Sequence, residues 1–239
     1  MQVIARVFIT LAIVLSTVLP ASAERPRPLG WAIEAMQSGD WDAALQIAGK
    51  DGLVARDIIE WARLREGQGS FDEVAAFLQR RPDWPGERYL RRQSENAVLA
   101  QSDATVLAFF ATTPAQTPGG VLRHATALTT AGRTSEAETT LITAWRDMPM
   151  GSAQQAMYLS AHAALLKEHH DARLDAMLWR GANGNARRMF DLASDGAVAA
   201  AKARIALRAG EKGVDTLIEA VPESHAKQGG LQYERFAWR

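Results

Sequence analysis

Apolar residues recur at helical spacing along the chain from Leu29 onward, and alternation of apolar and polar residues is nearly absent. The clearest stripe occupies positions i, i+4, i+7, i+8 and i+11 of one segment: Ala137, Leu141, Ala144, Trp145 and Met148. Glycine and proline interrupt such stretches at short intervals. The pattern predicts an all-α protein of roughly a dozen short helices with no strand.

Three expected helix starts carry capping signals. Asp40 precedes a segment that would bury Ala44, Ile47 and Ala48, and an aspartate is a favoured N-cap. Ser70 with Glu73, and Ser135 with Glu138, have the spacing of a capping box. Behind the first box, the buried side of the helix is predicted to consist of Val74, Phe77 and Leu78.

The turns between helices share a pattern in which a glycine is followed five residues later by a small residue. It occurs as Gly39-Asp40-Trp41-x-x-Ala44 and Gly132-Arg133-Thr134-x-x-Ala137, with a looser copy at Gly69. Glycine permits the positive φ that ends a helix, and alanine permits close helix packing. The pattern resembles the turn of a tetratricopeptide repeat without its strict period. We therefore expect a right-handed superhelix, or α-solenoid, of stacked helix pairs; a compact helical bundle remains the alternative.

The first 23 residues have the parts of a secretory signal peptide. Arg6 precedes an apolar stretch that is short for a bilayer span, and Ala21-Ser22-Ala23 forms a small-x-small cleavage site. We expect cleavage after Ala23, a periplasmic location, and a mature superhelical, U-shaped domain over residues 24–239. No second apolar segment follows, so no membrane span is expected in the mature chain.

Composition and charge remove several classes of function. Lys and Arg number 27 and Asp and Glu also number 27, which argues against nucleic acid as a partner. Cysteine is absent, so disulfides and thiolate chemistry are excluded. The run from Glu168 to Asp171 contains two adjacent histidines, which cannot chelate a metal from one helical face. No nucleophile elbow or phosphate-binding loop occurs. The sequence thus predicts no catalytic, cofactor-binding or metal-ligating residue.

Four aromatic residues are candidates for contact with a glycan or another domain. Trp84 lies between two prolines in a turn, and Tyr233, Phe236 and Trp238 crowd the last segment beside Leu231. Solenoids normally finish on a polar capping element. An aromatic final helix is therefore expected either to continue into further chain or to dock on a partner.

Several blocks of sequence resemble the alphaproteobacterial soluble lytic murein transglycosylases. The blocks are Arg81-Pro82-Asp83-Trp84-Pro85-Gly86, Leu90-Arg91-Arg92, Leu174-Asp175-Ala176-Met177-Leu178-Trp179-Arg180-Gly181 through Ala186-Arg187-Arg188-Met189, Ala203-Arg204-Ile205-Ala206-Leu207-Arg208, and Gly230-Leu231-x-Tyr233-Glu234-Arg235-Phe236-x-Trp238-Arg239. The order of these blocks, more than any single one, carries the resemblance, which covers residues 24–239.

The resemblance implies an N-terminal superhelical domain of a protein that cleaves the MurNAc–GlcNAc β-1,4 bond to a 1,6-anhydro product. In that family a separate C-terminal lysozyme-like domain holds the catalytic glutamate, in a Glu-Ser motif followed by a Gly-Leu-Met-Gln-like segment. Here Glu223-Ser224 stands alone after Pro222, so no catalytic residue transfers. We expect a scaffold inactive by itself, with peptidoglycan strands and its own catalytic domain as partners. The competing interpretation is a stand-alone periplasmic tetratricopeptide-like adaptor that binds a protein.

Overall fold

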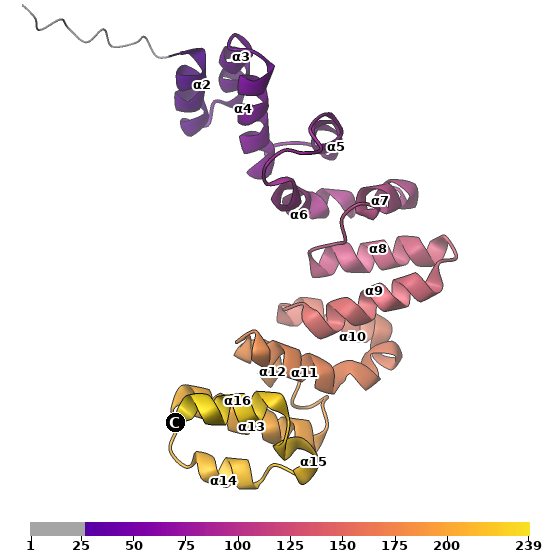
Figure 1. The fold of residues 1–239 in the computed structure, drawn as a ribbon. Coiled ribbons are helices and arrows are strands. Elements are labelled where there is room, and N and C mark those ends of the chain that lie inside the picture. Colours follow the sequence, from indigo (N-terminus) through magenta and orange to yellow (C-terminus); the bar gives the residue numbers. More distant parts are fainter. Residues whose placement is uncertain (1–26) are drawn as a thin grey trace, which may run out of the picture. The chain divides into compact units, whose positions relative to one another are not determined.

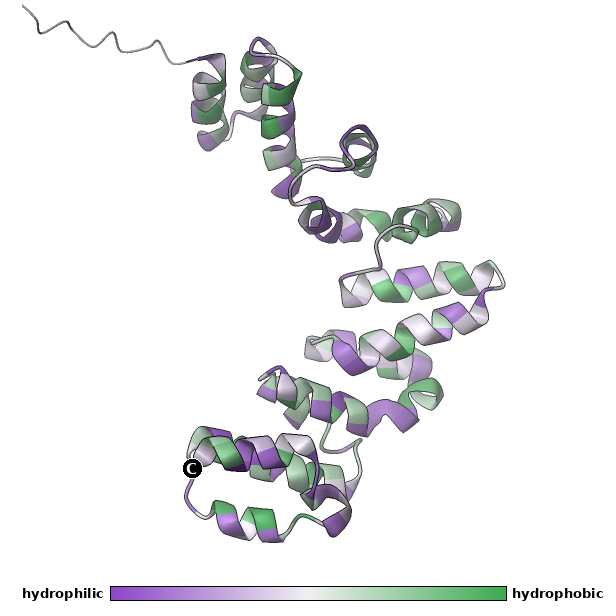
Figure 2. Ribbon diagram, viewed as in Figure 1, coloured by the Kyte–Doolittle hydropathy of each residue, from purple (hydrophilic) through white to green (hydrophobic). Residues whose placement is uncertain are grey.

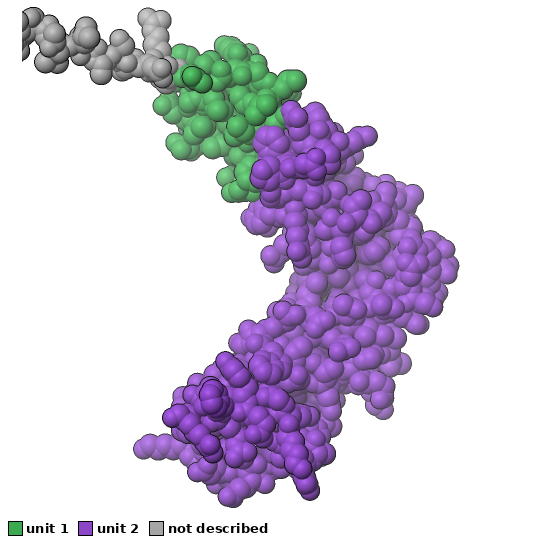
Figure 3. All heavy atoms as spheres, in the orientation of Figure 1, with its two compact units in different colours: residues 1–66 green, residues 67–239 purple. Residues whose placement is uncertain are grey.

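The computed structural model describes residues 27–239 and is built from helices (Figure 1). Over these residues there is no strand, as the spacing of apolar positions predicted. The signal peptide predicted for residues 1–23 lies outside the described residues. The chain divides into two compact units, residues 1–66 and 67–239 (Figure 3). The sequence predicted one helical domain over residues 24–239.

The described part of unit 1 consists of three short helices: α2 (Pro28–Gln37), α3 (Trp41–Gly49) and α4 (Leu53–Arg65). Asp40 caps α3 as expected, because its Oδ1 accepts a hydrogen bond from the amide of Ala43 at 3.1 Å. Gly39 takes a φ of 83° between α2 and α3. The core is made mostly of small residues, which permits close helix packing: Ala32, Ala44, Ala48, Ala55 and Ile59.

Unit 2 consists of helices joined by short turns, and neighbours in sequence are mostly neighbours in space. Its first helices are α5 (Phe71–Arg80), α6 (Glu87–Val98), α7 (Asp103–Phe110), α8 (Pro118–Thr130), α9 (Thr134–Asp147) and α10 (Ser152–Leu166). A 3₁₀ turn (Lys167–His169) leads to α11 (His170–Trp179), α12 (Asn183–Arg187), α13 (Asp195–Ala209), α14 (Val214–Glu219), α15 (Glu223–Ala226) and α16 (Gly229–Trp238). In this unit α9 packs on α11, α11 on α13, and α13 on α16.

One predicted capping box is present and the other is not. Ser70 Oγ accepts from the amide of Glu73, and the Glu73 carboxylate accepts from the amide of Ser70, at the start of α5. The second prediction is wrong, because α9 begins at Thr134 and places Ser135 inside the helix. Arg133 is the N-cap there, and its guanidinium pairs with Glu136 at 2.7 Å. The looser turn at Gly69 is also corrected: the glycine with positive φ after α4 is Gly67, at 76°.

The main core of unit 2 lies around Trp145, whose side chain is fully buried. The stripe predicted from the sequence lines this core, with Ala137, Leu141 and Ala144 buried and Met148 packed partly against it. A second cluster, which includes Leu207, Val214 and Leu231, joins α13 to α14 and α16. Figure 2 shows hydrophobic and hydrophilic residues alternating around these helices, as packing on one side requires.

Arginines from one helix repeatedly cap the carboxyl end of another. The last carbonyls of a helix have no partner within that helix. Arg123 of α8 donates to the carbonyls of Leu99 (3.2 Å) and Gln101 (2.6 Å), just beyond α6. Arg173 of α11 donates to Trp145 and Met148 at the end of α9, and Arg208 of α13 donates to Leu178 at the end of α11. Each of these arginines thus joins its own helix to the helix two places earlier in the chain: α8 to α6, α11 to α9, and α13 to α11.

Candidate functional site

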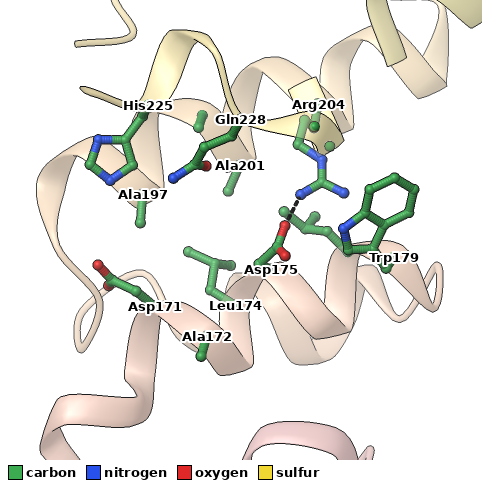
Figure 4. Close-up of a pocket in the computed structure, with 14 residues that line it drawn as sticks. Asp171, Ala172, Leu174, Asp175, Trp179, Ala197, Ala201, Arg204, His225 and Gln228 are labelled. Carbon is green, nitrogen blue, oxygen red and sulfur yellow. Dashed lines mark hydrogen bonds and ion pairs between the residues drawn. The ribbon is translucent and has the colours of Figure 1, made fainter. Parts of the chain in front are cut away.

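A pocket of about 410 Å³ opens between α11 on one side and α15 and α16 on the other (Figure 4). Its floor is α13, which presents Ala197, Ala200 and Ala201. These positions lie at i, i+3 and i+4, so they share one face of the helix. Because alanine fills little volume, the side chains of α11 and α16 remain apart above this face. The pocket therefore follows from the small residues of α13.

Two glycines shape the walls of the pocket. A Cβ at Gly196 would lie 2.6 Å from the His225 ring, and a Cβ at Gly230 would overlap the Arg204 guanidinium. Both glycines are buried, and both neighbouring side chains line the pocket. These two glycines thus leave the space that the His225 ring and the Arg204 guanidinium occupy.

The wall formed by α11 is acidic. Asp171 accepts hydrogen bonds from the Ser194 amide at 2.7 Å and the Ser194 hydroxyl at 2.6 Å, which anchors the start of α13. Asp175, one helical turn further, pairs through Oδ1 with Arg204 Nη1 at 2.5 Å. The Asp175 side chain is 51% exposed, so its second carboxylate oxygen is accessible beside the pocket.

Arg204 is the most constrained polar side chain of the site. Its side chain is only 4% exposed, and its guanidinium lies over the ring of Trp179 at 5.1 Å from the centroid. Nε and Nη2 are buried and have no hydrogen-bond partner within the described chain. Unpaired buried N–H groups are costly, so Arg204 keeps its place at the pocket wall in spite of this cost.

An aromatic pair stands next to the pocket. Trp179 lines it, and the Tyr233 ring of α16 lies 5.5 Å from the Trp179 ring. The two residues are 50% and 54% exposed, respectively. An aromatic face is therefore available to a ligand beside the carboxylate of Asp175.

The four aromatic residues that the sequence analysis proposed as contact residues lie at different places in the structure. Tyr233 does not line the pocket itself, but its ring lies beside that of Trp179, which does. Phe236, also on α16, is 81% exposed. Trp238 lines a different depression, with Leu207, Val214 and Ile218. Trp84 lies in the turn between α5 and α6, as predicted, but packs edge-on against Phe77 at 5.6 Å. Contact of these four residues with a glycan or another domain stays a prediction.

Sequence reasoning missed the residues that form most of the pocket. Asp175 and Arg204 are 29 positions apart, and no motif marks them as partners. The available signal was indirect, because both residues belong to blocks that carry the family resemblance.

A second cavity of about 590 Å³ has a different character. It lies among α6, the start of α8 and the segment before α10, and is lined by Arg88, Arg92, Gln116, Thr117, Pro118, Met148, Pro149 and Gln154. Buried Glu95 holds the wall in place by accepting from the Gln116 and Thr117 amides, at 2.5 and 2.8 Å, and from the Thr117 hydroxyl at 2.5 Å. Burial raises the pKa of the Glu95 carboxyl, and these hydrogen bonds oppose that rise. All three bonds join Glu95 of α6 to the segment that leads into α8, so Glu95 has a structural role.

Of the histidine pair at 169–170, His170 packs in the core. His170 is buried with its ring 5.5 Å from that of Trp145, and neighbouring Asp171 is engaged by Ser194. Over residues 27–239, no three His, Cys, Asp or Glu side chains are grouped so that they could hold a metal ion.

Over the same residues, no helix combines the length and apolarity needed to cross a bilayer. Comparison with protein-family models, with curated proteins and with solved structures found no match to this chain. What can be said of its function therefore rests on its own residues.

Proposed function

We propose that the chain is the scaffold portion of an exported lytic transglycosylase and holds peptidoglycan strands. In this proposal, cleavage of the MurNAc–GlcNAc β-1,4 bond belongs to a lysozyme-like domain that these residues do not contain. Residues 24–239 would form a right-handed, tetratricopeptide-like superhelix in the periplasm after removal of the first 23 residues.

One observation carries the proposal: three of the five sequence blocks that resemble that family, although separate in the chain, meet at one pocket. Residues 174–189 contribute Asp175 and Trp179, residues 203–208 contribute Arg204, and residues 230–239 begin at Gly230. A shared structural role explains why these blocks occur together. Pockets with an aromatic face and a few placed polar groups are typical of ligand sites.

The arrangement of helices gives further support. In unit 2, α8 packs on α9, α9 on α11, and α11 on α13, so that contacts are mostly local, as in a solenoid. The space-filling view shows the surface of this unit hollowed along one side (Figure 3). Repeat proteins commonly use such surfaces for binding extended ligands.

Sedimentation with protein-free murein sacculi tests the proposal. We expect the purified chain to appear in the pellet with sacculi and to stay in solution with cellulose, an insoluble glycan of different chemistry. We also expect no release of 1,6-anhydro-muropeptides. A chain that stays in solution with sacculi, or that releases anhydro products by itself, would contradict the proposal.

A stand-alone adaptor that binds a protein is the second candidate. It is favoured by the aromatic side chains left exposed on α16, above all Phe236. Sacculi that retain their covalently bound proteins separate the two functions when compared with protein-free sacculi. The glycan scaffold is expected to bind both preparations, whereas an adaptor would bind only the preparation that carries protein.

A further inference from the structure

We propose that the pocket between α11, α13 and α16 is a saccharide subsite that takes one sugar ring of a glycan strand. The inference rests on the proposed function and deepens it, because it assigns the ligand to named residues. The volume of about 410 Å³ is within the range of small-ligand sites and suits a pyranose with part of its neighbour.

The first argument is the combination of surfaces. A pyranose has an apolar C–H face and a polar edge of hydroxyl groups. Trp179, half exposed beside the pocket, supplies an aromatic face, and Arg204 behind it fixes the ring by lying 5.1 Å from its centroid. Aromatic side chains bury large apolar area with little loss of conformational freedom. The site therefore offers a rigid surface to the sugar's C–H face.

The second argument is spare hydrogen-bonding capacity on opposite walls. Figure 4 shows His225 and Gln228 on one side of the pocket and Asp171 and Asp175 on the other. The Gln228 side chain is exposed at the pocket, and Asp175 bonds to Arg204 through Oδ1. An amide both donates and accepts, and a carboxylate oxygen accepts. Hydroxyl groups, which also donate and accept, match both walls.

The third argument is the buried arginine. The Arg204 side chain is more than nine-tenths buried, and its Nε and Nη2 have no partner. Gly230 leaves the space that the guanidinium occupies, and Asp175 holds it through Nη1. The guanidinium is therefore held in one place, by the ion pair with Asp175 and by the space that Gly230 leaves for it. We assign Arg204 as a positioning residue that holds Trp179 and Asp175 at the ligand.

The charges of the lining favour a neutral ligand. Asp171 and Asp175 provide two negative charges against one positive charge from Arg204, which is already paired. An anion would be repelled by this balance. An amine is the competing ligand, because it would pair with the two carboxylates, and it enters the test as a named probe.

Binding of chitotriose to the purified protein, followed by intrinsic tryptophan fluorescence and ligand-observed NMR, tests the inference. We expect saturable binding of chitotriose and no competition by spermidine, the amine probe. Trp179→Ala and Gln228→Ala should each weaken binding at least tenfold. Matched controls are Trp31→Ala, an aromatic residue exposed to 47% in unit 1, and Gln93→Ala on α6; both should bind as the original protein does.

One further measurement and one further variant separate loss of binding from loss of folding. Melting temperatures identify any variant that fails to fold, and Gln228 is exposed, so its replacement leaves the core intact. Ala197→Leu, which fills the pocket from its floor, should also abolish binding. Equal affinity in all variants, no saturable binding, or displacement of chitotriose by spermidine would overturn the inference. If chitotriose does not bind but the chain still sediments with sacculi, only the assignment of the subsite is wrong. If the chain neither binds chitotriose nor sediments with sacculi, the proposed function is wrong too.

Discussion

Helix α11 meets its two neighbours through the same residue types, arginine and tryptophan, with different results. Toward α9, Arg173 lies 4.5 Å from the Trp145 ring centroid and also donates to the carbonyls of Trp145 and Met148. Toward α13, the two tasks are divided. Arg204 lies over Trp179, while Arg208 donates to the Leu178 carbonyl.

The two interfaces also differ in how far they exclude solvent. Trp145 is 0% exposed, because Tyr158 and His170 cover its ring. Trp179 is 50% exposed and faces the pocket. The Arg173 guanidinium is buried in the core, and this burial lowers its pKa to about 10. The comparison teaches that the same pair of residue types can lie in the core at one helix interface and border an open pocket at the next.

The largest expected effect distinguishes the two tryptophans. Trp145→Ala should reduce the free energy of unfolding by about 3–5 kcal/mol, because it leaves a large cavity in a close-packed core. Trp179→Ala should cost only about 1 kcal/mol, since half of that side chain is already in water. Urea denaturation followed by circular dichroism measures both. Equal losses would show that the two interfaces do not differ as described.

The second prediction concerns the two arginines. Arg173→Met should cost about 2–4 kcal/mol, because the buried carbonyls of Trp145 and Met148 lose their donor. Arg204→Met should cost about 1 kcal/mol, because Asp175 is half exposed and can be solvated. Thermal unfolding of the two variants under one buffer condition tests this order. A costlier Arg204→Met would mean that Arg204 belongs to the core.

The third prediction tests the space around Arg204. Gly230→Ala should cost about 1–2 kcal/mol, because the new methyl group overlaps a guanidinium that is too buried to swing away. The double variant Gly230→Ala/Arg204→Ala should lose less than the sum of the single changes. A double-mutant cycle from urea denaturation measures this coupling. Gly229→Ala is the control, because no atom lies within 4 Å of its added Cβ. Additive losses would contradict the close contact.

The smallest expected effect is on pH dependence. Burial lowers the pKa of His170, although Asp171 opposes the shift. The folded state therefore takes up the proton less readily than the unfolded state, so this contribution to stability is present above the usual histidine pKa and is lost as the pH falls through the lowered value. His170→Phe should flatten the fall in stability between pH 7 and 5. His124 and His162, whose pKa values burial also lowers, provide the remaining slope. An unchanged slope in His170→Phe would contradict the burial of this ring.

Local features of the fold were predictable because neighbouring residues decide them. Asp40, Ser70 and Glu73 cap helices as expected, since their hydrogen bonds span only three residues. The second capping box failed for the same local reason: Arg133 can reach Glu136, and the helix starts one residue before Ser135. Spacing alone does not decide between two competing local pairs.

The candidate site was far less predictable, because its parts come from distant helices. Nothing local marks Gly230 as the residue that makes room for Arg204, or Gly196 as the one that makes room for His225. The exposed aromatics of α16 were foreseen as a set, yet only Tyr233 proved to lie beside Trp179. Trp84 was placed correctly in its turn, but its contact with Phe77 depends on the packing of α5.

The amino-acid sequence alone thus determined the helical class, the apolar stripe that includes Trp145, and most of the turns, because periodicity and capping act over a few residues. Tertiary structure alone decided which arginine caps which helix, that Trp179 stays half exposed, and where a pocket opens. These outcomes depend on how closely alanine and glycine let the helices approach one another. The distance between packed helices is set by all the contacts of unit 2 together.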